Sequence, residues 1–318
     1  MPTDKITLKE KPAAAVAGKG AEPSRQSTPR RNFALATIAL VLCFGVPIYH
    51  LITFAAQNEL YSYILLMPLV SWYLIRLKKP GALSHSKPLR GAGVGLGVAG
   101  AAVLAGYFVF GRSVLKLEME DYLAMNILAF LLFLFGAAGI FLGRETLRAC
   151  AFPLGILVFI IPMPVFLRHA VEIFLQYGSA FAAQGMFQLS GMPFIRDGLV
   201  FRLPGVSLQV ATECSGIHSS YILLLTSLLA GYLFLRSPWK RGLLALVIIP
   251  LSLLRNGFRI FTIGQLCVHI GPHMIDSFIH RKGGPIFFVL SLIPFFCLLA
   301  YLHRSERANK KPGSSTSA

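Results

Sequence analysis

Eight apolar runs, each about as long as a membrane span, constrain this chain more than any other feature of its sequence. They cover residues 32–56, 60–77, 89–110, 122–142, 147–167, 217–235, 241–268 and 285–302. A helix needs roughly 20 mostly apolar residues to cross the hydrocarbon core of a bilayer. Only 14% of the 318 residues are charged, against roughly 25% in soluble proteins. The sequence therefore predicts an all-α, polytopic transmembrane bundle of about eight spans.

Lysine and arginine gather in alternate loops and at both ends of the chain. The clusters are Arg25, Arg30 and Arg31; Arg76, Lys78, Lys79, Lys87 and Arg90; Arg144 and Arg148; Arg236, Lys240 and Arg241; and Arg304, Arg307, Lys310 and Lys311. Basic loops tend to stay in the cytoplasm beside anionic lipid. An even number of spans with cytoplasmic N- and C-termini satisfies every cluster. The net charge of +17 thus has a membrane explanation, and nucleic acid is not an expected partner.

Composition divides the chain into three parts. Residues 1–31 are rich in Pro, Ala, Ser, Lys and Arg and contain almost nothing to bury, which predicts a disordered cytoplasmic tail. Residues 32–303 form the predicted membrane-embedded domain, and residues 304–318 a second disordered, basic cytoplasmic tail.

One stretch does not fit a plain span. Residues 169–189 have apolar residues at helical spacing but also contain Glu172 and three glutamines. We expect a helix that lies in the outer interface or packs inside the bundle, because an extra span would invert the topology after it. Residues 191–210 then alternate polar and apolar with Gly and Pro, which predicts a short extracytoplasmic β-like segment leading to Cys214.

A glycine motif in the third apolar run has a structural explanation. Residues 95–100 match G-x-G-x-x-G, but no strand precedes them and no acidic residue follows at the required distance. We therefore interpret Gly93, Gly97 and Gly100 as sites of close helix packing and expect no nucleotide.

Two arginines lie inside the seventh run. At about 1.5 Å per residue from Arg241, Arg255 lies about 21 Å and Arg259 about 27 Å into a core of roughly 30 Å. The two are four residues apart and share a helix face. Arg259 is near enough to the outer headgroups to snorkel, but two arginines with Asn256 between them indicate a polar cavity.

A polar segment follows that run. Gly271-Pro272 is expected to end one helix, and Pro272 can begin another. His273, Asp276 and His280 would then share a face with metal-ligand spacing. No second ligand cluster exists in the sequence, so a metal is the lesser hypothesis.

Cys214 differs from the other four cysteines. Cys43, Cys150, Cys267 and Cys297 lie in or beside apolar runs, whereas Cys214 follows Ala211-Thr212-Glu213. The predicted topology brings Cys214, Arg259 and His280 to the same outer leaflet. A thiol beside a cation is a nucleophile, histidine transfers protons and arginine binds an oxyanion. The three residues are candidates for an acyl-transfer site.

The order of these motifs resembles the exosortase/archaeosortase family of membrane-embedded cysteine transpeptidases, over roughly residues 59–303. The motifs that carry the resemblance most strongly are Cys214-Ser215-Gly216-Ile217, Asn256-x-x-Arg259-Ile260 and Phe278-Ile279-His280 with Gly284 following. Weaker agreement comes from four other segments. They are Tyr61-Ser62-Tyr63, Phe152-Pro153-Leu154, Ile160-Ile161-Pro162-Met163-Pro164 and, in the stretch before Cys214, Gly191…Gly198…Leu203-Pro204-Gly205.

The resemblance implies a function. Cys214 would be the nucleophile and Arg259 and His280 its catalytic partners, with no cofactor. The substrates would be exported, membrane-anchored proteins whose C-terminal signal, of the PEP-CTERM type, joins a short motif, a transmembrane helix and a basic tail. Cleavage would take place at the outer face of the plasma membrane, the inner membrane of a cell with two, and the acyl group would pass to a surface acceptor.

The chain departs from the family at one position. The family usually has arginine two residues after the glycine of C-S-G, where this chain has His218. His218 thus competes with His280 for the role of base, and Arg255, which is outside the shared pattern, is expected to support the site together with Asn256. Two other hypotheses remain, an anion transporter that uses the intramembrane arginines and a metal-dependent membrane hydrolase.

Overall fold

The computed structural model describes residues 27–78, 87–111, 118–212, 215–276 and 283–308. The first half contains α1 (Ser27–Cys43), α2 (Gly45–Gln57), η1 (Glu59–Leu65), α3 (Met67–Arg76), α4 (Arg90–Gly106), η3 (Tyr107–Gly111) and α5 (Met119–Leu142). The second half contains α6 (Arg144–Ala149), α7 (Ala151–Gly155), η4 (Ile156–Ile160), α8 (Val165–Leu189), β1 (Ile195–Asp197), β2 (Val200–Leu203), β3 (Val206–Gln209), α9 (Ile217–Phe234), α10 (Pro238–His269), η6 (Pro272–Asp276) and α12 (Gly284–Ala308).

The helices are long and apolar enough to confirm a polytopic membrane protein. Among the described helices, five have the length and composition to cross a bilayer: α4 with its π-helical extension, α5, α9, α10 and α12. Two bent pairs, α1 with α2 and the segment α7–η4 with α8, raise the number to seven. The predicted run 60–77 folds as η1 followed by the ten-residue α3. The expected number of about eight spans and the cytoplasmic termini stay predictions.

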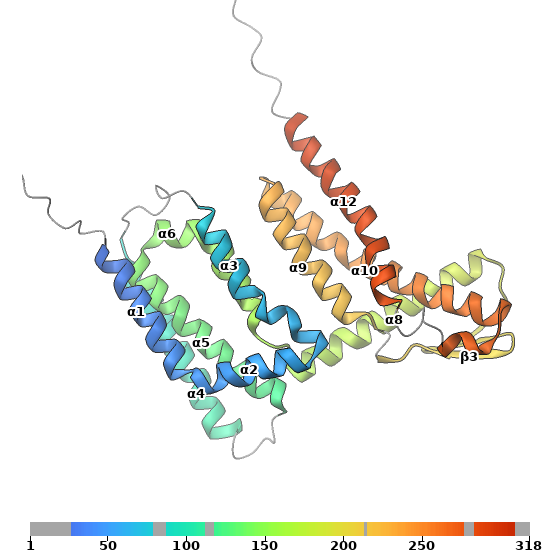
Figure 1. Ribbon diagram of the computed structural model, residues 1–318, viewed down its shortest axis with the longest axis horizontal. Helices are drawn as coiled ribbons and strands as arrows, with labels where there is room; N and C mark the ends of the chain where they lie inside the picture. The colour runs from blue at the N-terminus through green and yellow to red at the C-terminus, as the bar shows by residue number, and fades with distance from the viewer. Residues whose placement is uncertain (1–26, 79–86, 112–117, 213–214, 277–282, 309–318) are drawn as a thin grey trace, which may run out of the picture.

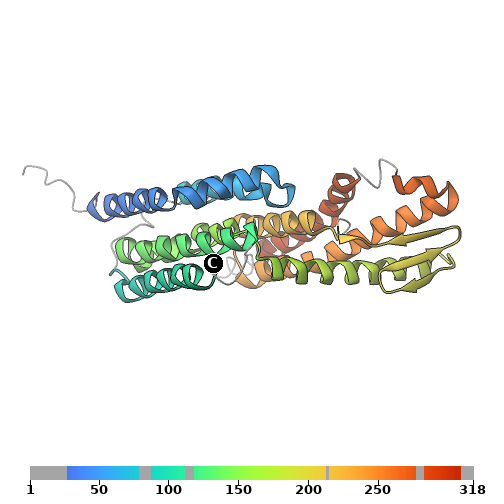
Figure 2. The ribbon, with the colours of Figure 1, turned by 90° about the horizontal axis from the view of Figure 1, so that it is seen from below.

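The bundle has two halves joined through the middle of the chain. Helices α1, α4 and α5 lie together on one side, and α9, α10 and α12 on the other (Figure 1). Helix α8 runs from the region between the halves to the far end of the molecule, where it lies with the sheet and the end of α10 (Figure 2).

The run 147–167 does not form the single helix that a continuous span requires. It begins as α6, α7 and η4, and the chain then leaves helical geometry before α8 starts at Val165. Helix α8 is turned by 93° from the helical segment before it. Pro162 and Pro164 explain the break, because proline lacks an N–H donor and disfavours helical geometry in the residue before it.

Glycines bring α4 and α5 into close contact. A Cβ atom on Gly93 would lie 2.7 Å from the carbonyl oxygen of Gly136, and one on Gly136 would lie 2.7 Å from that of Gly93. The packing interpretation is therefore confirmed for Gly93 and for Gly100, whose Cβ would lie 3.2 Å from the ring of Phe133. A Cβ atom on Gly97 would meet nothing within 4 Å, but the backbone nitrogen of Gly97 would lie 3.3 Å from a Cβ atom on Gly136.

A separate apolar core joins α8, α10 and the sheet. Phe187 of α8 packs with Phe201 of β2 and with Ile260 and Ile263 of α10. The strands form one antiparallel sheet in the order β1-β2-β3, so the β-like segment predicted before Cys214 is present. An open sheet cannot lie in hydrocarbon, because its edge groups would have no hydrogen-bond partners. We therefore expect this end of the molecule to lie outside the apolar core of the bilayer.

Candidate active site

Gly216 is the point where the chain turns from the sheet into α9. Its φ of +71° lies in the left-handed region, which glycine adopts without strain. A Cβ atom there would lie 3.0 Å from Nη2 of Arg255 and 3.3 Å from Cγ of Asn256. Both the conformation and the close approach of α10 therefore require glycine at this position.

Side chains from α10 hold the backbone of the turn. Arg255 Nη2 donates to the carbonyl oxygen of Gly216 over 3.3 Å and to Ser220 Oγ over 3.2 Å. Asn256 Nδ2 donates to the carbonyl oxygen of Ser215 over 3.3 Å. Arg255 and Asn256 are both buried, so these contacts are sheltered from water. The two residues expected to support the site are thus attached to the segment that directly follows Cys214.

The first turn of α9 is also tied to Gly216. Ser219 Oγ and Ser220 Oγ donate to its carbonyl oxygen over 3.2 Å and 2.8 Å, and Ser215 Oγ accepts from the N–H of Ile217 over 3.4 Å. The N–H groups at a helix start carry partial positive charge. This end of α9 is therefore a favourable place for a negative charge.

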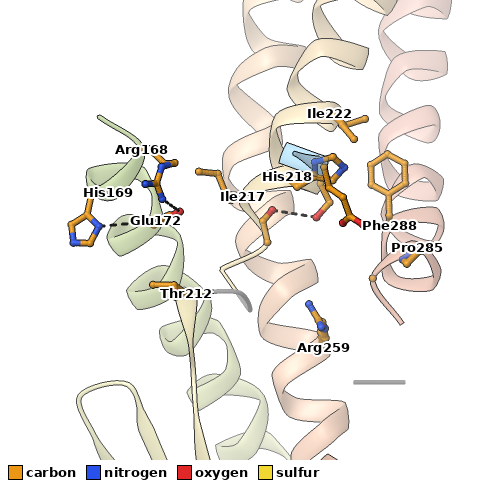
Figure 3. A pocket seen from close by; sticks show the side chains of 14 residues that line it. Arg168, His169, Glu172, Thr212, Ile217, His218, Ile222, Arg259, Pro285 and Phe288 are labelled. Carbon is orange, nitrogen blue, oxygen red and sulfur yellow. Dashed lines mark hydrogen bonds and ion pairs between the residues drawn. The ribbon is translucent and has the colours of Figure 1, made fainter. Parts of the chain in front are cut away.

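A cavity of about 940 Å³ lies beside this turn. Arg259 and His218 point into the same region of it (Figure 3). The remaining lining residues are Glu59, Arg168, His169, Glu172, Thr212, Gly216, Ile217, Ser219, Ile222, Gly284, Pro285 and Phe288. Arg255, one turn before Arg259 on α10, contacts the cavity wall at Gly216. The expected polar cavity around the intramembrane arginines is therefore present.

Cys214 and His280 lie outside the described residues, so their predicted roles stay predictions. Thr212 and Gly216 on either side of Cys214 line the cavity, as does Gly284, which follows His280 in the sequence. Arg259 and His218 line it directly. Arg259, the residues that flank Cys214 and a residue that follows His280 therefore all line one cavity.

His218 and Arg255 each carry a buried nitrogen atom with unused hydrogen-bonding capacity. His218 Nδ1 and Arg255 Nη1 have no hydrogen-bond partner within the described part of the chain. A buried polar group without a partner costs free energy. His218 lines the cavity, so its Nδ1 is suited to bind a polar group that enters there, whereas Arg255 Nη1 lies behind the cavity wall.

The wall at the start of α8 carries an ion-pair cluster that the sequence reasoning did not include. Arg168 Nε lies 2.9 Å from Glu120 Oε2, and Arg168 Nη1 lies 3.1 Å from Glu172 Oε1. His169 Nδ1 lies 3.8 Å from Glu172 Oε2. The spacing of Arg168 and Glu172, four residues apart, was a usable signal for the helical pair.

No group of three His, Cys, Asp or Glu side chains suited to a metal occurs among the residues that the structure describes. Pro272 begins a short 3-10 helix, η6. The metal hypothesis depends on His280, which lies outside the described ranges, and stays untested for that set.

Comparison with known proteins supplies the family. The family of transmembrane exosortases matches residues 52–297, about three quarters of the chain. Neither the curated proteins nor the solved structures contain a significant match. The matched range includes all three motifs that carry the resemblance in the sequence. The chain belongs to the transmembrane exosortase family.

Proposed function

We propose that this exosortase is a cysteine-dependent transpeptidase or protease that cleaves the C-terminal sorting signals of exported membrane-anchored proteins. The observation that supports it best is the attachment of Ser215 and Gly216 to Arg255 and Asn256 beside the cavity lined by Arg259 and His218. A nucleophile needs a fixed backbone and nearby cations to react at neutral pH. The segment after Cys214 has both.

In the proposed reaction, the Cys214 thiolate attacks the scissile carbonyl carbon. A C–S bond forms, and the carbonyl oxygen gains negative charge that Arg259 and the first N–H groups of α9 stabilise. The C–N bond then breaks, and the leaving amine takes a proton from the imidazolium of His280. Water or an acceptor nucleophile, deprotonated by the same imidazole, releases the acyl group from the thioester.

His218 is the alternative base in this scheme. It lines the cavity directly and stands where the family usually has arginine. We propose that His280 transfers the proton and that His218 contacts the substrate, with the site facing the extracytoplasmic side of the plasma membrane. Residues 1–31 and 304–318 are proposed as cytoplasmic tails of the membrane-embedded domain 32–303.

The test is processing of a tagged substrate that ends in motif, apolar span and basic tail. Cys214→Ala and Arg259→Ala are expected to leave the substrate at full length. Cys297→Ala is the matched control, because Cys297 is an exposed thiol on α12 and its loss is expected to change nothing. Trimming by the Cys214→Ala enzyme at the wild-type rate would contradict the proposal.

A second function is supported by the two arginines of α10, of which Arg255 is buried. Arg255 has a buried Nη1 without a partner among the described residues, as an anion-binding site in a transporter would. Such a transporter would carry an anion at the same rate after Cys214→Ala. Flux of this kind in vesicles, together with intact substrate in cells, would replace the peptidase proposal.

A further inference from the structure

Strand β3 is an edge of the small sheet. It pairs with β2 on one side, and the part of the chain that the structure describes has no strand on the other side. An exposed edge presents backbone donors and acceptors to any extended peptide that approaches. β3 is therefore a place where another strand can add.

The pairing of β2 with β3 determines which backbone groups face outward. Leu203 and Val206 flank the two-residue turn Pro204-Gly205 and are register partners, as are Phe201 and Leu208. Residues flanking a two-residue turn form a hydrogen-bonded pair, and such pairs alternate with non-hydrogen-bonded pairs along an antiparallel ladder. The backbone groups of Val206 and Leu208 therefore face β2, and those of Ser207 and Gln209 face the free edge, where the Gln209 carbonyl oxygen already accepts from the N–H of Ala211 over 3.1 Å.

A small cleft of about 30 Å³ borders β3 at Leu208, Gln209 and Val210. Its other wall is α10, with Asn256, Arg259, Ile260 and Ile263. Arg259 also lines the large cavity. The cleft and the cavity therefore share one residue, and it is the proposed catalytic arginine.

The chain connects the free edge to the cavity directly. Beyond β3, Val210 donates its N–H to the carbonyl oxygen of Leu199 over 2.9 Å, and its own carbonyl oxygen accepts from Gln176 Nε2 over 3.1 Å. Thr212, two residues further, lines the cavity. A peptide lying along β3 is thus aligned with the backbone that continues to Cys214.

We propose that the substrate segment carrying the scissile bond binds as a fourth strand along the free edge of β3. This proposal rests on the proposed function. Hydrogen bonds to the N–H and carbonyl groups of Ser207 and to the N–H of Gln209 would supply affinity that does not depend on sequence, as in other edge-strand complexes. Alternate side chains would enter the cleft between β3 and α10, whose size admits only a small side chain at that point.

The test is disulfide trapping between single cysteines. The enzyme carries Cys214→Ala and alanine at its other four cysteines, so that substrate binds without being cleaved. Ser207→Cys or Gln209→Cys is then added and paired with a cysteine scanned through the substrate segment. The proposal predicts strong cross-links at every second substrate position, because side chains alternate between the faces of a strand.

Arg202→Cys is the matched control. Arg202 is exposed, and it is the register partner of Ser207 on β2, one strand further from the free edge. It is expected to cross-link at least tenfold less than Ser207→Cys. Equal yields at both positions, or yields without a two-residue period, would overturn the proposal.

A kinetic variant separates this proposal from the proposed function. Ser207→Pro in the otherwise wild-type enzyme removes an N–H that faces the free edge and keeps the ladder with β2, a position where proline is tolerated. We expect KM to rise about tenfold with kcat little changed. If processing depends on Cys214 but KM is unchanged in Ser207→Pro, the edge-strand proposal alone is contradicted. If processing does not need Cys214, the proposed function is contradicted.

Discussion

Arg255 Nη2 lies 3.3 Å from the carbonyl oxygen of Gly216, although the two residues are 39 positions apart in the sequence. The contact joins the middle of α10 to the turn that follows Cys214. It places a buried cation against a backbone carbonyl, so the hydrogen bond competes with little solvent. We therefore expect Arg255 to act as a positioning residue for the proposed nucleophile.

Replacing Arg255 is expected to slow processing without weakening substrate binding. A hydrogen bond from a charged group contributes about 1.5–3 kcal/mol, which corresponds to a loss in kcat of roughly 10- to 150-fold for Arg255→Gln. Arg255→Lys keeps the charge and is expected to recover part of the rate. Thr262→Ala serves as the control, because Thr262 is a half-buried residue of the same helix whose hydroxyl donates to the carbonyl oxygen of Phe258 in that helix. A rise in KM at constant kcat would argue against a positioning role.

Gly216→Ala is expected to abolish processing. The alanine would carry the cost of a left-handed conformation, about 1–2 kcal/mol, and its Cβ would also displace Arg255. Gly205→Ala isolates the first effect, because Gly205 has a φ of +78° but open space around its Cβ position. Processing activity and thermal stability in detergent are measured for both variants. Equal losses in the two variants would show that contact with Arg255 is unimportant.

The ion-pair cluster at the start of α8 is expected to stabilise the fold. Arg168→Met leaves the carboxylates of Glu120 and Glu172 without their cation, and we expect a loss of about 1–3 kcal/mol. Arg168→Met combined with Glu172→Met is expected to recover part of that loss. Arg202→Met is the control, since Arg202 and Asp197 form an exposed pair 3.8 Å apart that is expected to contribute about 0–1 kcal/mol. Equal effects of the two single variants on the free energy of unfolding would contradict this account.

Gly93→Val is expected to destabilise the α4–α5 contact by about 1–3 kcal/mol, because the added atoms overlap the backbone of Gly136. Gly95→Val is the control, since a Cβ atom there meets nothing within 4 Å. Thermal unfolding in detergent distinguishes them. A greater loss of thermal stability in Gly95→Val than in Gly93→Val would contradict the assignment of close packing to Gly93.

The sequence predicts the helices well, because the bilayer imposes a length and a composition on each span. The runs 122–142 and 217–235 agree with α5 and α9 to within three residues. Two predicted runs are divided in the structure. Pro162 and Pro164 interrupt the helix within the run 147–167, and the run 32–56 bends by 72° between α1 and α2, directly before Gly45.

The cavity could be predicted only in part. Arg255, Asn256 and Arg259 were identifiable because polar side chains are costly within a span. The spacing of Arg168 and Glu172 indicated their helical pair, but the contact of Arg168 with Glu120 could not be predicted, since Glu120 lies 48 residues before Arg168 and only the folded chain brings them together. The free edge of β3 was equally hidden, because strand order is a property of the sheet rather than of any one strand.

The measurement that tests the central claim most directly is detection of the acyl-enzyme. Wild-type enzyme and tagged substrate are denatured in acid during turnover, and the enzyme is examined by mass spectrometry. We predict an adduct of the N-terminal substrate fragment on the peptide containing Cys214, removed by neutral hydroxylamine as a thioester is, and absent from Cys214→Ala. Substrate that is cleaved at the wild-type rate by Cys214→Ala, with no hydroxylamine-sensitive adduct in either enzyme, would contradict the account.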